Sequence, residues 1–163
     1  MIRRTRCRMN VCCGLLALLL SFIWGNSLLP GHISGAFSDW LKNVLTDLFP
    51  FLFSGMPGNT GGGLLRKLAH FSEFTALGVC FSWLYGMLIS QRHRQLLYAV
   101  ISGIIVACVD ETIQRFVPLR NGCLTDVGID TSGVITGIIL FLIAYLIRKK
   151  MQHNTQKNTR QSQ

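Results

Sequence analysis

The sequence predicts an all-α membrane protein, a bundle of four transmembrane helices that forms a single domain over residues 1–163. Of these residues, 50% are hydrophobic and only 14% are charged, and the mean hydropathy is +0.41. Such a composition is too apolar for an ordinary soluble domain. A helix crosses a bilayer with roughly 20 apolar residues, and four runs reach that length. They cover about residues 11–29, 64–89, 96–117 and 127–147.

The first run follows the basic segment MIRRTRCRMN, an arrangement that signal peptides also have. No small-x-small cleavage site follows, because the run continues through Gly25, Asn26, Ser27 and Leu28. We therefore expect this run to be retained as a membrane helix. A mature N-terminus near residue 30 would contradict that expectation.

The basic residues predict how the helices are oriented. Eleven of the 16 Lys and Arg residues lie before residue 9, in the loop 90–95 and in the basic tail 148–163, and these pieces contain no acidic residue. Four spans place all three pieces on one side, which the positive-inside rule assigns to the cytoplasm. We expect both termini there, with the tail attracted to anionic membrane lipids. No nucleic acid partner is expected, because no folded module is available to present the charges.

The segment between the first two runs, residues 30–63, is expected to lie outside. Its apolar residues recur at helical spacing and predict an amphipathic helix over about residues 35–49. Ser34 is the expected N-cap, and Pro50 is expected to stop the helix. This helix would lie either along the outer membrane surface or across the mouth of the bundle. The glycine-rich residues 58–63 are expected to break any regular element and to act either as a lid or, as we favour, as a connector.

Three of the four runs carry ionisable or polar residues at the end that faces outside. In chain order these residues are Arg66, Lys67, His70, Glu73, Asp110, Glu111, Gln114, Arg115, Asp126 and Asp130. In each of the second and third runs the polar stretch covers about 10 Å of helix, so the groups reach similar depth. Ionisable groups cost several kcal/mol in hydrocarbon and therefore indicate a functional site. We expect the three helices to turn these side chains into one shared pocket.

The fourth run also suggests how the helices pack. Asp126 and Asp130 share a helical face that continues into Gly133 and Gly137. The two glycines have the GxxxG spacing that permits close helix approach. They serve either packing inside the bundle, which we favour, or dimerisation. The sequence leaves the oligomeric state open.

A purely structural role for the polar residues is the main alternative. The five acids are opposed by four cations, and His70 can supply the balancing charge. The cations are Arg66, Lys67, Arg115 and Arg120. A buried ion-pair network could hold the helices in register. Buried pairs contribute little net stability, because desolvation offsets their attraction, and we therefore favour a function.

Two fragments carry a family resemblance. KLAHFSEFTALG, followed by DETIQRFVPLRNGCLTDVGIDTSGVITG, resembles the VanZ-like membrane protein family. The matching positions are Lys67, His70, Glu73, Asp110, Glu111, Gln114, Pro118, Arg120, Asp126, Gly133 and Gly137, with Ser27 a weaker match. Phe74 stands where the family usually has Tyr, and Asp130 where it usually has Asn. The resemblance implies a multipass protein of the bacterial plasma membrane, whose namesake is linked to resistance to the glycopeptide teicoplanin.

The residue types favour binding of, or chemistry on, a phosphate-bearing envelope lipid. The partner would be a phospholipid headgroup or a lipid-linked cell-wall precursor. The candidate substrate-binding residues are Arg66, Lys67, Gln114, Arg120 and Asp130, of which the arginines suit a phosphate best. The candidate catalytic residues are His70, Glu73, Asp110, Glu111 and Asp126. Within that set, Asp110, Glu111 and Asp126 are the candidate ligands of a divalent cation, and His70 or Glu73 would exchange a proton.

Two other classes of function remain open at this stage. The first is a non-catalytic envelope factor that binds a ligand or docks a partner, since no recognised nucleophile motif, P-loop or complete metal signature is present. The second is proton or ion transport through the same acids and His70. The cytoplasmic halves of the runs carry no matching charges, which disfavours a relay across the membrane.

Overall fold

The computed structural model describes residues 2–48, 50–53, 58–120 and 122–161. These residues form five long helices, one single-turn helix and no strand. The long helices are α1 (Ile2–Ser27), α2 (Gly31–Leu48), α4 (Gly58–Leu88), α5 (Arg92–Arg115) and α6 (Leu124–Gln161). The single turn is α3 (Pro50–Phe53). The all-helical expectation is confirmed.

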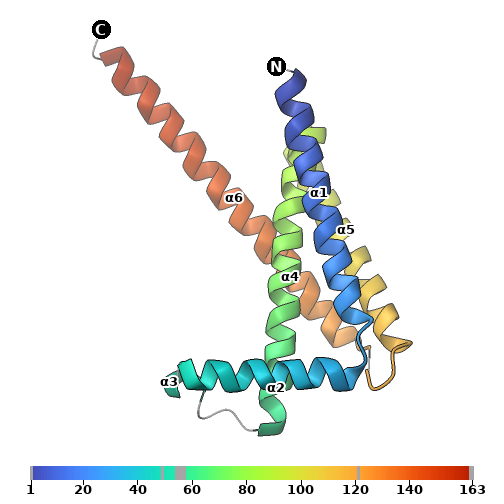
Figure 1. The fold of residues 1–163 in the computed structure, drawn as a ribbon. Helices are drawn as coiled ribbons and strands as arrows, with labels where there is room; N and C mark the ends of the chain where they lie inside the picture. Colours follow the sequence, from blue (N-terminus) through green and yellow to red (C-terminus); the bar gives the residue numbers. More distant parts are fainter. Residues whose placement is uncertain (1, 49, 54–57, 121, 162–163) are drawn as a thin grey trace.

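Four of the long helices run along the molecule in alternating directions. In Figure 1, α1 and α5 run toward α2, α4 and α6 run away from it, and both termini lie at the same end. We call this end the terminal end and the opposite one, which α2 crosses, the α2 end. Within the part of the chain that the structure describes, three helices are long and apolar enough to cross a membrane, over Thr5–Ser27, Arg92–Arg115 and Leu124–Lys157. This finding supports a membrane protein; α4 is not among the three.

The helix boundaries differ from the expected ones mainly by extension. α4 begins at Gly58, so the expectation that residues 58–63 break any regular element is wrong. Its glycines are tolerated because a helix that already continues into an apolar run loses only about 1 kcal/mol per glycine. α5 begins at Arg92 within the expected loop 90–95, where Arg92 Nη1 donates to Gln95 Oε1 at 2.9 Å. α6 continues through most of the basic tail, to Gln161.

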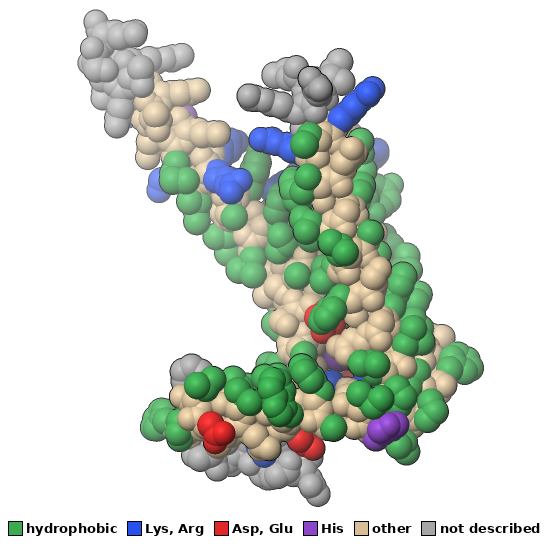
Figure 2. All heavy atoms as spheres, in the orientation of Figure 1, with side chains coloured by type: hydrophobic (Ala, Val, Ile, Leu, Met, Phe, Trp, Pro, Cys, Tyr) green, Lys and Arg blue, Asp and Glu red, His purple; other side chains and the backbone are tan. Residues whose placement is uncertain are grey.

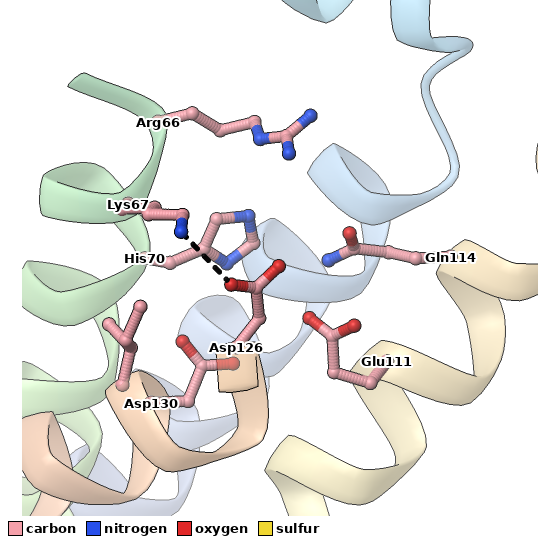
Figure 3. Close-up of a pocket in the computed structure, with 8 residues that line it drawn as sticks. Arg66, Lys67, His70, Glu111, Gln114, Asp126 and Asp130 are labelled. Carbon is pink, nitrogen blue, oxygen red and sulfur yellow. Dashed lines mark ion pairs between the residues drawn. The ribbon is translucent and has the colours of Figure 1, made fainter. Parts of the chain in front are cut away.

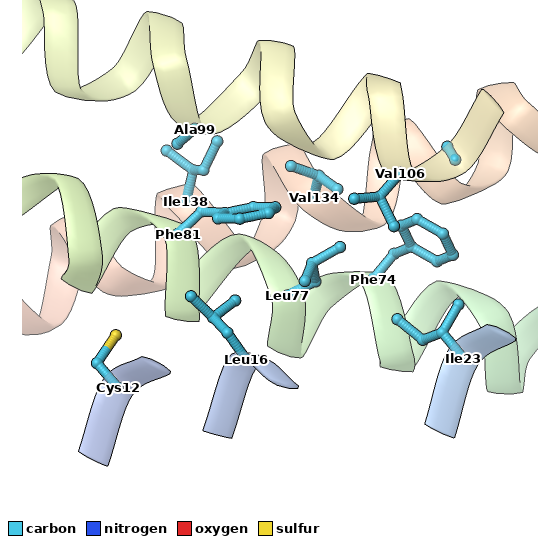
Figure 4. Packing of buried hydrophobic residues seen from close by; sticks show 11 residues of the cluster. Cys12, Leu16, Ile23, Phe74, Leu77, Phe81, Ala99, Val106, Val134 and Ile138 are labelled. Atoms are coloured by element: carbon cyan, nitrogen blue, oxygen red, sulfur yellow. The ribbon is translucent and has the colours of Figure 1, made fainter. Parts of the chain in front are cut away.

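The core of the bundle is built around α4. Figure 4 shows Phe74, Leu77 and Phe81 of α4 between side chains of α1, α5 and α6. α1 contributes Cys12, Leu16 and Ile23, α5 contributes Ala99, Val106 and Ala107, and α6 contributes Val134 and Ile138. α4 thus packs against α1, α5 and α6, and its contact with α6 is the most extensive in the bundle.

Glycines allow α4 and α6 to approach closely. A Cβ on Gly78 of α4 would collide with the backbone oxygen of Val134. A Cβ on Gly137 of α6 would collide with the backbone oxygen of Thr75, and Gly133 faces the backbone of Phe71 in the same way. The GxxxG pair thus serves packing inside the bundle, as favoured from the sequence.

The amphipathic helix predicted over residues 35–49 is α2, but its start differs from the expectation. Ser34 is not the N-cap, because the helix already begins at Gly31, immediately after Pro30. Ser34 and Ser38 are its buried residues, and Ser38 Oγ donates to the Ser34 carbonyl at 2.9 Å. Small serines let α2 lie close to the bundle, where it contacts α4. The helix ends at Leu48, just before Pro50, as predicted.

The apolar face of α2 is left largely uncovered. Phe37, Trp40 and Leu48 are exposed, and the rings of the first two pack together at a centroid distance of 5.7 Å. In Figure 2, hydrophobic side chains of α2 gather on the side turned toward the long helices, and acidic side chains lie lower on the same helix. A helix of this pattern suits a membrane surface.

Candidate functional site

A polar pocket lies near the α2 end, where α4, α5 and α6 meet. Figure 3 shows its lining, and the pocket has about 10 Å³ of space, roughly enough for one water molecule or ion. The residues that line it are Arg66, Lys67, His70, Glu111, Gln114, Asp126, Ile129 and Asp130. Seven of the ten residues predicted as the site therefore meet here, and the structure brings together the polar ends of the three helices.

Helical spacing explains how each helix reaches the pocket. On α4, His70 and Phe74 lie one turn apart and are both buried, so the stripe that faces the core ends in a histidine. On α5, Asp110 and Gln114 lie one turn apart in the same manner, and both are buried. On α6, Asp130 is buried one turn after Asp126, which is partly exposed.

The deepest part of the site is a buried group formed by His70, Asp110 and Asp130. One potential ligand atom from each residue lies within 4.8 Å of the others. His70 Nδ1 is 3.8 Å from Asp110 Oδ2, and no hydrogen bond is made by His70 Nδ1, Asp110 Oδ1 or Asp130 Oδ2. Buried polar atoms normally have partners, so these three are open to a ligand.

The other oxygen of Asp110 is held in place by Gln114. The Gln114 amide Nε2 donates to Asp110 Oδ2 at 2.9 Å and to Ser27 Oγ at 3.3 Å. Ser27 is fully buried at the end of α1. This chain of contacts joins α1 to α5 and fixes the orientation of the Asp110 carboxylate, a role the sequence did not assign to Gln114.

Glu73 lies apart from the pocket, toward α1. Its Oε1 accepts a hydrogen bond from Asn26 Nδ2 at 3.4 Å, and its Oε2 is buried without a partner. The sequence reading did not single out Asn26 as a site residue. In the sequence, Asn26 is a polar amide at the end of an otherwise apolar run. Its role can be recognised only once its partner on α4, Glu73, is known.

Two polar contacts tie the rim of the pocket together. Lys67 Nζ is 3.7 Å from Asp126 Oδ1, the ion pair drawn as a dashed line in Figure 3. Glu111 Oε2 accepts a hydrogen bond from the backbone N–H of Cys123 at 2.8 Å. Both acids are thus engaged by groups of the chain itself. That they bind a cation together with Asp110 stays a prediction.

Arg120 is buried outside the pocket, in the link between α5 and α6. Its Nε donates to the Leu29 carbonyl at 3.0 Å and its Nη2 to the Asn26 carbonyl at 2.8 Å. The Gly31 N–H, in turn, donates to the Pro118 carbonyl. Burial lowers the pKa of Arg120, but an arginine keeps its charge at neutral pH. Arg120 therefore joins the two links at the α2 end, and its contact with a substrate stays a prediction.

Arg115, which the sequence grouped with the cations of the cluster, is exposed. Arg66 lies at the pocket and differs from the other cations. Among the described residues, no hydrogen bond or ion pair within 4 Å engages its guanidinium. It is the cation of this site that is free to meet an anion from outside.

Comparison with known proteins identifies one family. The model of the family described as VanZ/LLP1 matches residues 12–146, which is most of the chain and includes α4, α5 and the pocket. No curated protein and no solved structure matches.

Proposed function

This chain belongs to the VanZ/LLP1 family, and from that premise we propose that it crosses the bacterial plasma membrane four times, through α1, α4, α5 and α6. α1 and α5 run in the same direction, so the chain has to return between them, and α4 is the helix that does so. Lys and Arg side chains gather near the terminal end in Figure 2. The positive-inside rule then puts both termini in the cytoplasm and the α2 end outside.

The polar pocket is proposed to bind the phosphate group of an envelope lipid, either a phospholipid or a lipid-linked cell-wall precursor. The observation that carries this proposal is the free guanidinium of Arg66 at a pocket whose other cation, Lys67, is already paired with Asp126. Arginine binds phosphate with two parallel hydrogen bonds, which a lysine cannot do.

The surroundings of Arg66 favour a lipid over a free solute. Leu64 and Leu68, on the same turns of α4, are 44% and 51% exposed. Exposed leucines beside a free arginine suit a ligand that combines acyl chains with an anionic head. With the α2 end outside, the pocket lies at the depth of the outer headgroups.

The buried acids support a catalytic version of this function. His70, Asp110 and Glu111 offer groups that exchange protons, and they lie within the same cluster as the phosphate-binding cation. In this version, Arg66 holds the phosphate, water adds to its phosphorus as the bond to the lipid oxygen breaks, and His70 or an acid passes the proton of the water to the leaving oxygen. Resistance to teicoplanin would then follow from a changed pool of surface lipid or precursor.

Non-catalytic binding is the second candidate, and one observation favours it. The acids Glu111 and Asp126 are engaged by Cys123 and Lys67, which leaves fewer groups for chemistry. In this version the pocket binds the same headgroup, or docks a partner, without turnover. Transport is less favoured, because the buried acids and His70 among the described residues all belong to the α2 half of α4, α5 and α6.

The test is binding and turnover of lipid phosphate by the purified protein in nanodiscs. We expect a polyprenyl phosphate or an anionic phospholipid to bind, and Arg66→Gln to weaken binding at least about tenfold, since a charged hydrogen-bonding partner contributes roughly 1.5–3 kcal/mol. Arg94→Gln, at the terminal end, is the matched control and should bind as wild type does. Equal binding by wild type and Arg66→Gln would refute the proposed phosphate site.

Turnover separates the two versions of the function. Phosphate release above background by wild type, with loss in Asp110→Asn, supports catalysis. Background release by both proteins, with binding intact, supports the non-catalytic version. In cells, the teicoplanin susceptibility of a strain expressing wild type should differ from that of a strain expressing Arg66→Gln.

A further inference from the structure

We propose that His70, Asp110 and Asp130 form a binding site for one divalent transition-metal ion, of the Mn²⁺ or Zn²⁺ type. The three residues come from three different helices, α4, α5 and α6, and face one another in the interior of the bundle. This inference rests on the proposed function only for the use of the ion, which would add positive charge beside the phosphate.

The burial of unsatisfied ligand atoms is the first observation. His70, Asp110 and Asp130 are 8%, 0% and 1% exposed, and each carries a buried atom with no hydrogen-bond partner. Unsatisfied carboxylate oxygens are costly in a protein interior unless a proton, a cation or a hydrogen-bond donor meets them. Here all three open atoms belong to one group.

The balance of charges in the bundle interior also favours a bound cation. Four acids are buried there, namely Glu73, Asp110, Glu111 and Asp130. The one buried Lys or Arg among the described residues is Arg120, whose Nε and Nη2 donate to backbone carbonyls while its Nη1 is buried without a partner. A divalent cation would supply the missing compensation, and Asp130 supplies an anionic ligand where an Asn would be neutral.

The geometry suits one ion after a small adjustment. Ligands bonded at about 2.0–2.2 Å to the same ion lie roughly 3–4 Å apart, and the three atoms here are within 4.8 Å of each other. The adjoining pocket, lined by His70 and Asp130, has about 10 Å³ of space, which suits an ion or its bound water better than an organic ligand.

A second layer of contacts already orients one ligand. Gln114 holds Oδ2 of Asp110 and leaves Oδ1 free, as metal-binding carboxylates are commonly held by neighbouring donors. An imidazole combined with carboxylates is a ligand set for Mn²⁺, Zn²⁺ or related ions, whereas Mg²⁺ and Ca²⁺ prefer oxygen ligands alone.

The experiment measures metal binding directly, without lipid. The full chain carries an affinity tag free of histidine, is stripped with a chelator in detergent, and is titrated with Mn²⁺ followed by electron paramagnetic resonance. Bound Zn²⁺ is measured by mass spectrometry after gel filtration. We expect a single saturable ion per chain, with Zn²⁺ displacing Mn²⁺. Failure of the stripped wild type to bind either ion would overturn the site and leave protonation to neutralise the acids.

Variants assign the ligands. His70→Ala and Asp130→Asn should each weaken binding by at least about tenfold, since even loss of a supporting contact costs 10–100-fold in metal sites. His93→Ala and Asp47→Asn remove the same residue types at exposed positions and should bind as wild type does. Asp130→Asn keeps the shape of the side chain, so this variant still tests the assigned ligands if His70→Ala does not fold. Unchanged affinity in Asp130→Asn would refute the assigned ligand set.

Cobalt provides a signature of direct coordination. Co²⁺ bound to the wild type should give visible absorption bands that change in Asp130→Asn and stay the same in Asp47→Asn.

The experiments distinguish a failure of the metal site from a failure of the proposed phosphate site. Metal binding with no effect of Arg66→Gln on lipid would refute the phosphate site alone, and lipid binding by a chain that takes up no metal would refute the metal site alone.

Discussion

The two ends of this bundle treat ionisable residues in opposite ways. At the α2 end, His70, Asp110 and Asp130 are buried between helices and have open polar atoms. At the terminal end, basic side chains are exposed: Arg94 lies at the surface, and every described side chain of α6 from residue 143 to residue 157 is exposed. Charge at the surface costs little, and charge in the interior costs several kcal/mol unless it is compensated. The buried group at the α2 end therefore needs a ligand or a use, whereas the exposed basic residues at the terminal end need only solvent or lipid headgroups.

The largest expected difference between the two ends is their accessibility to a reagent added outside the cell. Cys123 lies exposed at the α2 end, and hydrogen bonds from Thr125 lower the pKa of its thiol. A membrane-impermeant maleimide added to intact cells should therefore label a chain in which Cys123 is the sole cysteine. A chain with Gln156→Cys as its sole cysteine should be labelled only after lysis. The reverse pattern would invert the topology and place the pocket on the cytoplasmic side.

Arginines at the two ends should differ strongly in their effect on stability. Arg120 is 6% exposed and donates to two backbone carbonyls, so Arg120→Met should lower the free energy of unfolding by about 2–5 kcal/mol. Arg94→Met at the terminal end should change it by less than about 0.5 kcal/mol. Thermal unfolding in detergent measures both. Similar small losses in both variants would mean that Arg120 is not needed to join the two links.

The smallest expected effect on stability comes from two glycines of α4 that lie on the same helix but in different surroundings. Gly78 faces the backbone of α6, whereas a Cβ on Gly86, nearer the terminal end, would have nothing within 4 Å. Gly78→Ala should destabilise the bundle by about 1–3 kcal/mol, because the helices have to separate. Gly86→Ala should be neutral or stabilise by up to about 1 kcal/mol through helix propensity. The same unfolding assay compares them, and equal stability would refute close α4–α6 packing.

The class of this protein could be predicted from its amino-acid sequence. Apolar composition and run length predicted an all-helical membrane protein, because a backbone in lipid has to satisfy its own hydrogen bonds and does so as helices. The fragments around Lys67 and Asp126 identified the family that the comparison then matched. The polar ends of three runs predicted a shared site, since alternating helices bring those ends together.

The way in which the polar residues of that site are divided into groups became clear only from the packing of the helices. Spacing along a helix shows which residues share a face, but it does not show which face of a neighbouring helix they meet. Only the packing of α4 against α5 and α6 separated the open group around His70 from Glu111, which Cys123 engages, and from Arg120, which holds the links. Contacts between distant segments set this division, and no local pattern of residues encodes it. The start of α4 at Gly58 has a different cause, since the helix extends from its apolar run through the glycines at 58–63 at a cost of only about 1 kcal/mol per glycine.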